Sequence, residues 1–335
     1  MSKVHSVITG IGAYVPKYRL TNEELSTMVD TSDEWITQRI GIKERPILKP
    51  EEGRGVSYLA EKAIENMMSK KAIDPLSIEA VIMATTTPDY LMPNTSASIA
   101  TKMGMTNAFG FDINAACSGF LYGLEVADNF IASGKYKKIL FISGDVLSSM
   151  TDYTDRNTCP IFADGCGCVL IEPTTDEGIG YQDAIIRSEG DLTGYLRTPA
   201  GGSVYPATQE IMDKGMYAIH QEGRVVFKHA VAKMADTCEE LMKRNNLNKE
   251  DISWVVPHQA NLRIIDAVAH RMGVPIEKVM INIEKYGNCS AGTIALCLNQ
   301  WEPRLKKGDN IILTAFGGGF AWGATYIKWG YDYHA

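Results

Sequence analysis

The sequence predicts a mixed α/β fold built from two similar halves. Helical patterns alternate with short β-branched runs along the chain, which is typical of sheets covered by helices. The chain also resembles itself, because residues 69–84 and 243–258 share one order of helix end, polar turn and strand. Segment 135–145 resembles 306–319 at a nearly equal offset. Repeats in the same order indicate a weak tandem duplication.

The first half is placed at residues 1–174 and carries three clear elements. They are a helix over 57–69, a strand over 81–85 and a helix over 118–133 that ends at Gly134. On this last helix Leu121, Leu124 and Ala127 recur at three-to-four spacing, followed by Phe130 or Ile131. Such a stripe predicts a buried helix face.

The second half, residues 175–335, follows the same order after the polar stretch EPTTDEG. We expect helices over 225–245 and 261–272 and strands over 254–257 and 310–316. Each strand run is short and rich in β-branched residues, as expected for strands buried between layers. The polar stretch therefore predicts the boundary near residue 175.

Composition restricts the class of protein. The 335 residues are 45% hydrophobic and 22% charged, which predicts a packed globular chain, and the net charge of −7 argues against a general nucleic-acid binder. The longest apolar stretches, such as 138–143, are too short for a membrane span, and the first ten residues lack a signal-peptide core. Seven scattered cysteines suit a reducing compartment. We expect a cytoplasmic protein without nucleic-acid or membrane partners.

Cys117 lies in the stretch FDINAACSGF, between a strand-like approach and a predicted helix. Most free cysteines are inert core residues, which is the alternative interpretation. The small residues Ala115, Ala116 and Gly119 leave room around a nucleophile, and the helix N-terminus favours the thiolate by about 0.3–1 kcal/mol. Because this effect is small, we expect a second group to assist Cys117.

Two candidates for that group lie in the second half. His258 ends the strand WVVP, and Asn288 occupies a turn that the repeat places opposite Asn114. Taken alone, each residue has a structural interpretation, a core histidine and a turn asparagine. Equivalent strand ends of a duplicated fold converge, however, so we expect both side chains to lie near Cys117.

The motifs themselves resemble a known family. The strings NAACSGF, PHQANLRII, EKYGN and AFGGGFAWG occur in this order, and VDTSDEWITQRIGIKER lies near the start. Together they are similar to β-ketoacyl-acyl-carrier-protein synthase III, a condensing enzyme that initiates fatty-acid synthesis. The resemblance implies a thiolase-like fold, with two halves in a pseudo-twofold repeat and an α-β-α-β-α layering. It also implies a homodimer, acyl-CoA and malonyl-acyl carrier protein as substrates, and no metal or redox cofactor.

The resemblance implies a role for each motif residue. Cys117 would accept the acyl group as a thioester, with the amides of Cys117 and Gly318 binding the oxyanion. His258 and Asn288 would donate hydrogen bonds to the malonyl thioester oxygen during decarboxylation. Phe316 would form a dry wall beside the malonyl carboxylate.

CoA is expected at a helix that begins near residues 31–34, which fit a capping box. Trp35 and Arg39 then lie one turn apart, where an indole and a guanidinium could flank adenine, although a plain surface packing pair is the alternative. The resemblance favours the adenine role for both. It adds Arg156, Asn261 and Arg263 as contacts for pantetheine or phosphate.

Carrier protein is expected at basic residues on the helix after His258. Arg263, His270 and Arg271 share one face of that helix, and the resemblance adds Lys228. A solvated helix face is the alternative interpretation. A local basic patch on an acidic enzyme would steer an acidic partner.

Several positions depart from the family pattern. Cys289 follows Asn288 where the family commonly has a hydroxyl residue, and Met92 stands where the family closes the partner's acyl pocket. A flexible methionine tolerates several shapes, so acetyl is the default primer and longer or branched acyl groups remain open. Residues 201–221 are longer than in compact members, and we expect them to cover the entrance.

Other functions fit the sequence less well. The main alternative is a related enzyme of secondary metabolism that acylates another acceptor. A papain-like hydrolase lacks the duplicated plan, and a catalytically inactive carrier-protein scaffold would not need all three candidate side chains. A hydroxymethylglutaryl-CoA synthase would need a glutamate where Thr85–Thr87 stand, and a plant-type polyketide synthase would differ at FGGGF. The glycines in TGIGAY predict a turn at a strand end rather than a dinucleotide site.

Overall fold

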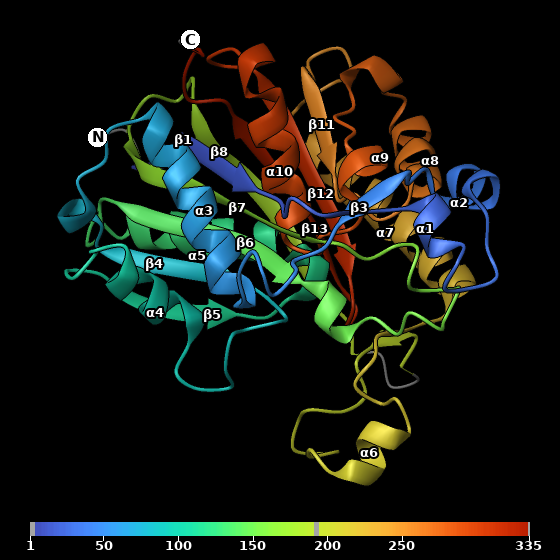
Figure 1. Cartoon of the computed structure of the whole chain (residues 1–335). Helices are drawn as coiled ribbons and strands as arrows, with labels where there is room; N and C mark the ends of the chain where they lie inside the picture. Colours follow the sequence, from blue (N-terminus) through green and yellow to red (C-terminus); the bar gives the residue numbers. More distant parts are fainter. Residues whose placement is uncertain (1–3, 191–193, 334–335) are drawn as a thin grey trace.

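The computed structural model describes residues 4–190 and 194–333 and contains two main sheets (Figure 1). The first sheet has the order β1-β7-β6-β4-β5. Strand β4 runs parallel to β5 and β6, whereas β7 runs antiparallel to β6 and β1. The strands are β1 (His5–Tyr14), β4 (Ala80–Ala84), β5 (Phe109–Ile113), β6 (Ile139–Val146) and β7 (Asp164–Thr174).

The second sheet repeats this plan. Its order is β11-β12-β13-β8, with β11 parallel to β12 and the other pairs antiparallel. A parallel bridge between Val255 and Val279 lies beside β11, where β5 lies beside β4 in the first sheet. The strands are β8 (Gly180–Ser188), β11 (Trp254–Pro257), β12 (Asn310–Gly317) and β13 (Ala321–Lys328). The shared pattern confirms the predicted duplication.

Helices form three layers around the two sheets. α3 (Gly55–Lys70) and α4 (Thr95–Lys102) cover the first sheet, and α7 (Gly223–Arg244) and α8 (Leu262–Met272) cover the second. α5 (Gly119–Ala132) and α10 (Gly292–Trp301) lie between the sheets, and their buried residues form one core with both. This confirms the predicted five-layer arrangement.

The two middle helices meet at their N-terminal ends. A Cβ atom at Gly119 would lie 2.9 Å from the Cβ of Ala84 and 3.2 Å from that of Ala291. Gly119 begins α5 and Ala291 directly precedes α10. The small residues that we expected around Cys117 therefore allow the helix starts of both halves to approach each other closely.

The observed elements match the expected ranges within one or two residues, with two corrections. The glycines of TGIGAY lie inside β1 and not at a turn, because α3 packs on them: a Cβ atom at Gly12 would lie 2.2 Å from the carbonyl oxygen of Ala63. The helix near residue 31 is capped by Ser32, whose hydroxyl accepts from the Trp35 amide at 3.1 Å.

Smaller elements complete the chain. Four of them, α2, α9 and the paired strands β2 and β3, lie near α8 on one side of the second sheet (Figure 1). In Figure 1 the yellow segment that carries α6 lies apart from the rest of the molecule. These elements are β2 (Arg19–Thr21), α1 (Asn22–Leu25), α2 (Asp33–Ile40), β3 (Glu44–Pro46), β9 (Leu196–Arg197), α6 (Gln209–Asp213), β10 (His220–Gln221) and α9 (Ile283–Tyr286).

The chain passes from the first sheet to the second between β7, which ends at Thr174, and β8, which begins at Gly180. We propose to keep the division of the halves at residue 175. All seven cysteines are free. Within the described residues, no helix combines the length and apolar character that crossing a membrane requires.

Candidate active site

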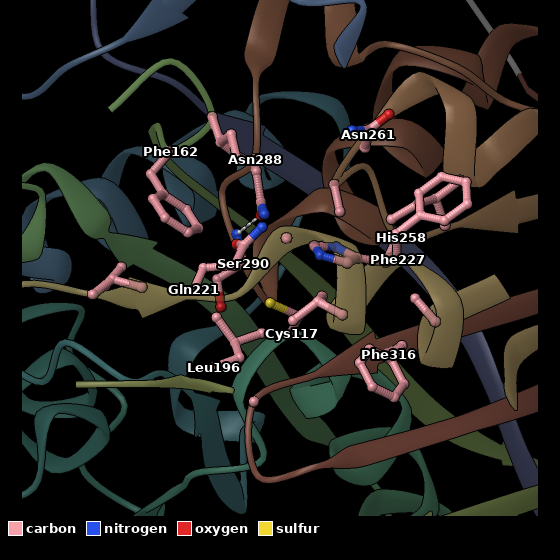
Figure 2. A pocket seen from close by; sticks show the side chains of 18 of the residues that line it. Cys117, Phe162, Leu196, Gln221, Phe227, His258, Asn261, Asn288, Ser290 and Phe316 are labelled. Carbon is pink, nitrogen blue, oxygen red and sulfur yellow. Dashed lines mark hydrogen bonds between the residues drawn. The ribbon is translucent and has the colours of Figure 1, made fainter. Parts of the chain in front are cut away.

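A cavity of about 620 Å³ opens between the two halves, at the ends of β5, β11 and β12. Figure 2 shows Cys117, His258 and Asn288 around it, together with Phe316. Gly318 also lines it. The five residues that the motifs singled out for chemistry are therefore brought together, although they lie far apart in the sequence.

Cys117 sits in a short 3-10 turn, Ala116–Ser118, between β5 and α5. Its side chain is partly exposed to the cavity. Ala116 has a φ of 45°, a left-handed conformation that costs energy for a residue with a side chain. Gly317 of the other half packs closely against this turn, because a Cβ atom at Gly317 would lie only 2.7 Å from the Cys117 nitrogen.

The Cys117 thiol is neutral near pH 7. A helix N-terminus alone would lower the thiol pKa, but the pKa of Cys117 is raised. Burial raises the pKa of Cys117 to about 12, hydrogen bonding from Ser290 lowers it in part, and the Asp145 carboxylate raises it further. Loss of hydration therefore changes the pKa of Cys117 more than the helix N-terminus does. Deprotonation of Cys117 must be assisted by a neighbouring group.

His258 follows β11 and is buried. Its Nδ1 atom lies 2.7 Å from the hydroxyl oxygen of Thr293 in the first turn of α10. Burial lowers the pKa of His258 to about 3. The imidazole is therefore uncharged near neutral pH, as a neutral hydrogen-bond donor or acceptor would require.

The Thr293 hydroxyl determines which imidazole nitrogen carries the proton. This hydroxyl also donates to the carbonyl oxygen of Ser290 at 3.1 Å. A hydroxyl has one proton, so when Thr293 donates to Ser290 the His258 Nδ1 must be the donor and Nε2 accepts. When Thr293 turns to donate to Nδ1, Nε2 carries the proton and donates. Both tautomers are accessible with one hydroxyl rotation.

Asn288 has a fixed side-chain orientation. Its backbone pairs with Ile161 and Ala163, and its Oδ1 accepts from the Ser290 amide at 2.8 Å. Because the oxygen is used in this way, the amide group Nδ2 is left to face the cavity as a donor. The same turn that favoured a structural role for Asn288 therefore also leaves its Nδ2 group as a hydrogen-bond donor.

Apolar side chains surround the sulfur. Phe316, at the end of β12, packs against Phe320 with ring centroids 4.8 Å apart. This wall keeps water from part of the cavity. The other aliphatic and phenylalanine side chains that line the cavity are Ile40, Ala116, Leu147, Met150, Ile161, Phe162, Leu196, Ile219, Val226, Phe227, Ala230, Met234, Ala260 and Ile264.

The residues expected to bind CoA lie in the wall of the cavity or in contact with it. Trp35, Arg39, Asn261 and Arg263 line it. Arg156 does not line it but places its guanidinium carbon 4.9 Å from the centroid of the Trp35 ring. The guanidinium that covers the indole is therefore that of Arg156 and not that of Arg39.

The residues expected to dock carrier protein lie on exposed surfaces of α7 and α8. Lys228, Arg263, His270 and Arg271 are all exposed, and Arg263 lies over the Phe227 ring at 5.6 Å. The surface is not uniformly basic, because Arg271 forms an ion pair with Asp236. Only Arg263 of this group lines the cavity.

Three departures from the family pattern were expected near the site: Met92, residues 201–221 and Cys289. Met92 is 85% exposed and does not line the cavity of its own chain. Residues 201–218 do not line the cavity either, whereas Ile219 and Gln221 do. The Cys289 thiol is buried and donates to the Tyr286 carbonyl at 3.3 Å. Cys289 therefore points away from the reacting groups.

Sequence reasoning missed several polar residues of the site. Arg197 and Arg224 line the cavity beside the expected basic residues. Arg224 is one helical turn before Lys228, a spacing that would have predicted a shared face. Ser290, which also lines the cavity, gave no local signal, because it meets Cys117 across the two halves.

The fold and these side chains define a thiolase-like condensing enzyme. Models described as 3-oxoacyl-[acyl-carrier-protein (ACP)] synthase III and its C-terminal part match residues 111–190 and 242–329. The β-ketoacyl-[acyl-carrier-protein] synthase III of Azobacteroides pseudotrichonymphae is 62% identical over 334 residues, which is 100% of both chains. Synthase III 1 of Bacteroides thetaiotaomicron is 56% identical, covering 99% of this chain and 98% of its own.

A solved structure agrees with these relatives. The crystal structure of 3-oxoacyl-[acyl-carrier-protein] synthase III from Aquifex aeolicus VF5 has a TM-score of 0.88 and 39% sequence identity, and the match covers 97% of this chain and 100% of that one. The chain belongs to the 3-oxoacyl-[acyl-carrier-protein] synthase III family. It is therefore an acyltransferase-type condensing enzyme of fatty-acid biosynthesis.

Proposed function

We propose that this enzyme condenses an acyl-CoA primer, acetyl-CoA by default, with malonyl-acyl carrier protein. Cys117 attacks the primer thioester, and the backbone amides of Cys117 and Gly318 bind the oxyanion of the tetrahedral intermediate. CoA leaves and the acyl group stays on the sulfur. The partly exposed sulfur in a largely apolar cavity supports this step.

The second step is decarboxylation of the malonyl group. His258 Nε2 and Asn288 Nδ2 donate to the malonyl thioester oxygen, where negative charge develops as CO₂ leaves. The wall at Phe316 disfavours the charged carboxylate. The enolate carbon attacks the acyl-Cys117 thioester, which gives 3-oxoacyl-acyl carrier protein and frees the cysteine. The low pKa of His258, which keeps the imidazole neutral, supports this role.

Coenzyme A is proposed to enter between α2 and α8. Adenine would separate Arg156 from Trp35, and Arg39, Asn261 and Arg263 would contact phosphate or pantetheine. Support comes from the stacked Arg156–Trp35 pair and from the other three residues on the cavity wall. Asn261 has a second role, because its Oδ1 caps α8 at the Arg263 amide at 2.9 Å.

Carrier protein is proposed to dock on α7 and α8 through Lys228, Arg263, His270 and Arg271. All four residues are exposed and Arg263 lines the cavity, on a chain whose net charge is −7. A local cationic surface would steer an acidic carrier domain toward the entrance. Arg224, which lines the cavity one turn before Lys228, extends the same surface.

The remaining assignments are also proposals. The enzyme is a cytoplasmic homodimer, in which Met92 helps to close the acyl pocket of the partner subunit. The exposed side chains of Tyr90, Leu91 and Met92 support such a contact. The reaction needs no metal or redox cofactor, because neutral donors of this chain meet the charge on each thioester oxygen.

The observation that carries the proposal is the meeting of Cys117, His258 and Asn288 in one cavity. It is tested by intact-mass spectrometry after mixing the enzyme with straight, branched and aromatic acyl-CoAs. We expect a mass gain on Cys117 that disappears, with 3-oxoacyl product, when malonyl-acyl carrier protein is added. A persistent adduct would favour another acceptor in secondary metabolism, and no adduct would reject the nucleophile.

A further inference from the structure

A buried arginine that does not line the cavity binds segments from which the cavity is built. Arg45 is the middle residue of β3 and is fully buried. Its guanidinium donates to the carbonyl oxygen of Pro160 at 3.0 Å, to that of Leu20 at 3.1 Å and to Oδ1 of Asn22. Burial lowers the pKa of Arg45 to about 10, so the side chain is charged near neutral pH. None of the three acceptors carries a charge, and a cation in such surroundings is costly to bury.

One arm of this network reaches α2, the helix proposed to bind CoA. Asn22, which begins α1 and is buried, uses its side-chain oxygen to accept from Arg45. Its Nδ2 group donates to Oδ1 of Asp33 and to the carbonyl oxygen of Ile42, each at 2.8 Å. Asp33 is the first residue of α2, and Trp35 of the same turn lines the cavity. Arg45 therefore supports the start of α2 through Asn22.

A second arm reaches the loop between β6 and β7. Pro160 of this loop accepts from Nε of Arg45. Residues 155–159, directly before it, form a turn that is closed by a backbone hydrogen bond of 3.0 Å between its two ends. This turn carries Arg156, which lies over the Trp35 ring. We call Trp35 and Arg156 the CoA clamp, and both of its members are thus supported by one guanidinium.

The same loop also holds the turn that carries Asn288. The Asn288 amide donates to the Ile161 carbonyl oxygen at 3.0 Å, and the Ala163 amide donates to the Asn288 carbonyl oxygen at 2.9 Å. Arg45 packs against this turn as well, because a Cβ atom at Gly287 would lie 3.4 Å from the Cβ of Arg45. Strand β3 also contacts α9, the helix that leads into the turn (Figure 1). Arg45 therefore supports the Asn288 turn both through the loop and by direct packing.

We propose that Arg45 is a positioning residue for both steps of the reaction: it sets the CoA clamp for acylation and the Asn288 turn for decarboxylation. A guanidinium presents its donors in a rigid planar fork. The fork therefore fixes where Asn22 and Pro160 lie relative to each other, and with them the two parts of the site. The inference rests on the proposed roles of the clamp and of Asn288.

Arg45→Lys is the main test, because lysine keeps the charge but replaces the fork with a single point donor. We expect KM for acetyl-CoA to rise about threefold to tenfold, the effect of about one hydrogen bond to the ligand. Malonyl decarboxylation, measured in a single turnover per acetylated enzyme molecule, should fall about tenfold or more. Partial unfolding behaves differently, because it removes active enzyme without changing the KM of the molecules that remain folded.

Asn22→Asp separates the two arms. Aspartate still accepts from Arg45 but cannot donate to Asp33, and the two carboxylates repel each other. We expect KM for acetyl-CoA to rise as in Arg45→Lys, while decarboxylation keeps its wild-type rate because Pro160 keeps its donor. An equal fall in decarboxylation in both variants would indicate general loosening and overturn the inference. If Arg45→Lys does not fold, an unchanged KM in Asn22→Asp would reject the inference by itself.

Hydrogen exchange of the free enzyme adds a measurement that needs no substrate. Arg45→Lys should speed amide exchange at the start of α2 and in the paired segments around Ile161 and Asn288. Arg187→Lys is the matched control, because Arg187 also forms a guanidinium contact, an ion pair with Glu240, but does not line the cavity. The control should keep the wild-type exchange, KM and decarboxylation rate. Unchanged exchange of both segments in Arg45→Lys would reject the inference.

Failure of the proposed CoA site gives a different pattern. If Trp35→Ala raises KM for acetyl-CoA and Arg45→Lys does not, the inference fails while the CoA site stands. If neither variant raises KM, the CoA site is wrong. The decarboxylation rate and the exchange of Arg45→Lys then decide the inference: a tenfold fall with faster exchange supports the link to Asn288, and wild-type values reject it.

Discussion

The Nδ1 atom of His258 lies 2.7 Å from the hydroxyl of Thr293, a residue of the central helix α10. This contact joins the end of the strand that carries the imidazole to the layer between the two sheets. Since burial keeps the imidazole neutral, the hydroxyl decides whether the nitrogen facing the cavity accepts or donates. The chemistry of His258 therefore depends on a neighbour that no motif pointed to.

Thr293→Val should impair decarboxylation more than acylation. Without the hydroxyl nothing donates to Nδ1, so the tautomer in which Nε2 carries the proton and donates to the malonyl thioester is no longer stabilised. We expect malonyl decarboxylation to fall about tenfold or more, while Cys117 acylation by acetyl-CoA changes less. Single-turnover assays of each step measure this difference. Thr293→Ser should restore decarboxylation, and failure of this rescue would point to a packing effect.

His258 should make the protein less stable in acid. Its pKa in the folded state, about 3, lies below the ordinary value of 6.5, so between these values the unfolded chain binds more protons than the folded one. The stability that the neutral imidazole contributes is complete above about pH 6.5 and is lost as the pH falls toward 3. The free energy of unfolding should decline by at most about 1.4 kcal/mol per pH unit from this residue.

Denaturant unfolding at a series of pH values measures this slope. The His258→Asn variant lacks the titrating group, so its free energy of unfolding should decline less steeply between pH 6.5 and 4. Equal slopes in the two proteins would show that His258 does not control acid stability.

Trp35→Ala and Arg156→Ala should weaken CoA binding selectively. Loss of either half of the stacked pair should raise KM for acetyl-CoA about threefold to thirtyfold with little change in kcat. Steady-state kinetics with varied acetyl-CoA provide the measurement. Arg304→Ala is the matched control, because Arg304 lies over Trp301 at 4.5 Å, away from the cavity. If KM is unchanged in both site variants, the adenine site lies elsewhere.

Gly317→Ala should disrupt the nucleophile turn. The added methyl group would lie 2.7 Å from the Cys117 nitrogen and 3.1 Å from its Cβ, so backbone must move. We expect a loss of about 1–3 kcal/mol in stability and a severe loss of acylation. Gly202→Ala is the control, since nothing lies within 4 Å of a Cβ atom there. Normal acylation in Gly317→Ala would mean that the turn tolerates the shift.

The sequence was sufficient for the parts of the fold that local patterns determine. The strand WVVP coincides with β11, and the stripe Leu121, Leu124, Ala127 and Ile131 is the buried face of α5. Cys117, His258 and Asn288 could be placed together because the repeat makes their strand ends equivalent. The glycines of β1 were misjudged, because their reason lies in the packing of α3 and not in a turn.

The polar groups behind the reacting side chains could not be predicted. Ser290 lies close to Cys117 across the two halves, and Thr293 of α10 meets His258 at the end of β11. These contacts depend on the relative placement of layers, which periodicity does not specify. Motifs of the chain identify the reacting atoms, whereas the groups that orient them come from tertiary packing.

The most direct test of the two-step chemistry is the mass of the Asn288→Ala enzyme after acetyl-CoA and then malonyl-acyl carrier protein. Asn288 is proposed to act only in the second step. The variant should therefore gain an acetyl group on Cys117 and keep it after the carrier protein is added, while the wild-type enzyme loses it and forms 3-oxoacyl product. An Asn288→Ala enzyme that clears its acetyl group and makes product at the wild-type rate would contradict the proposed division of roles.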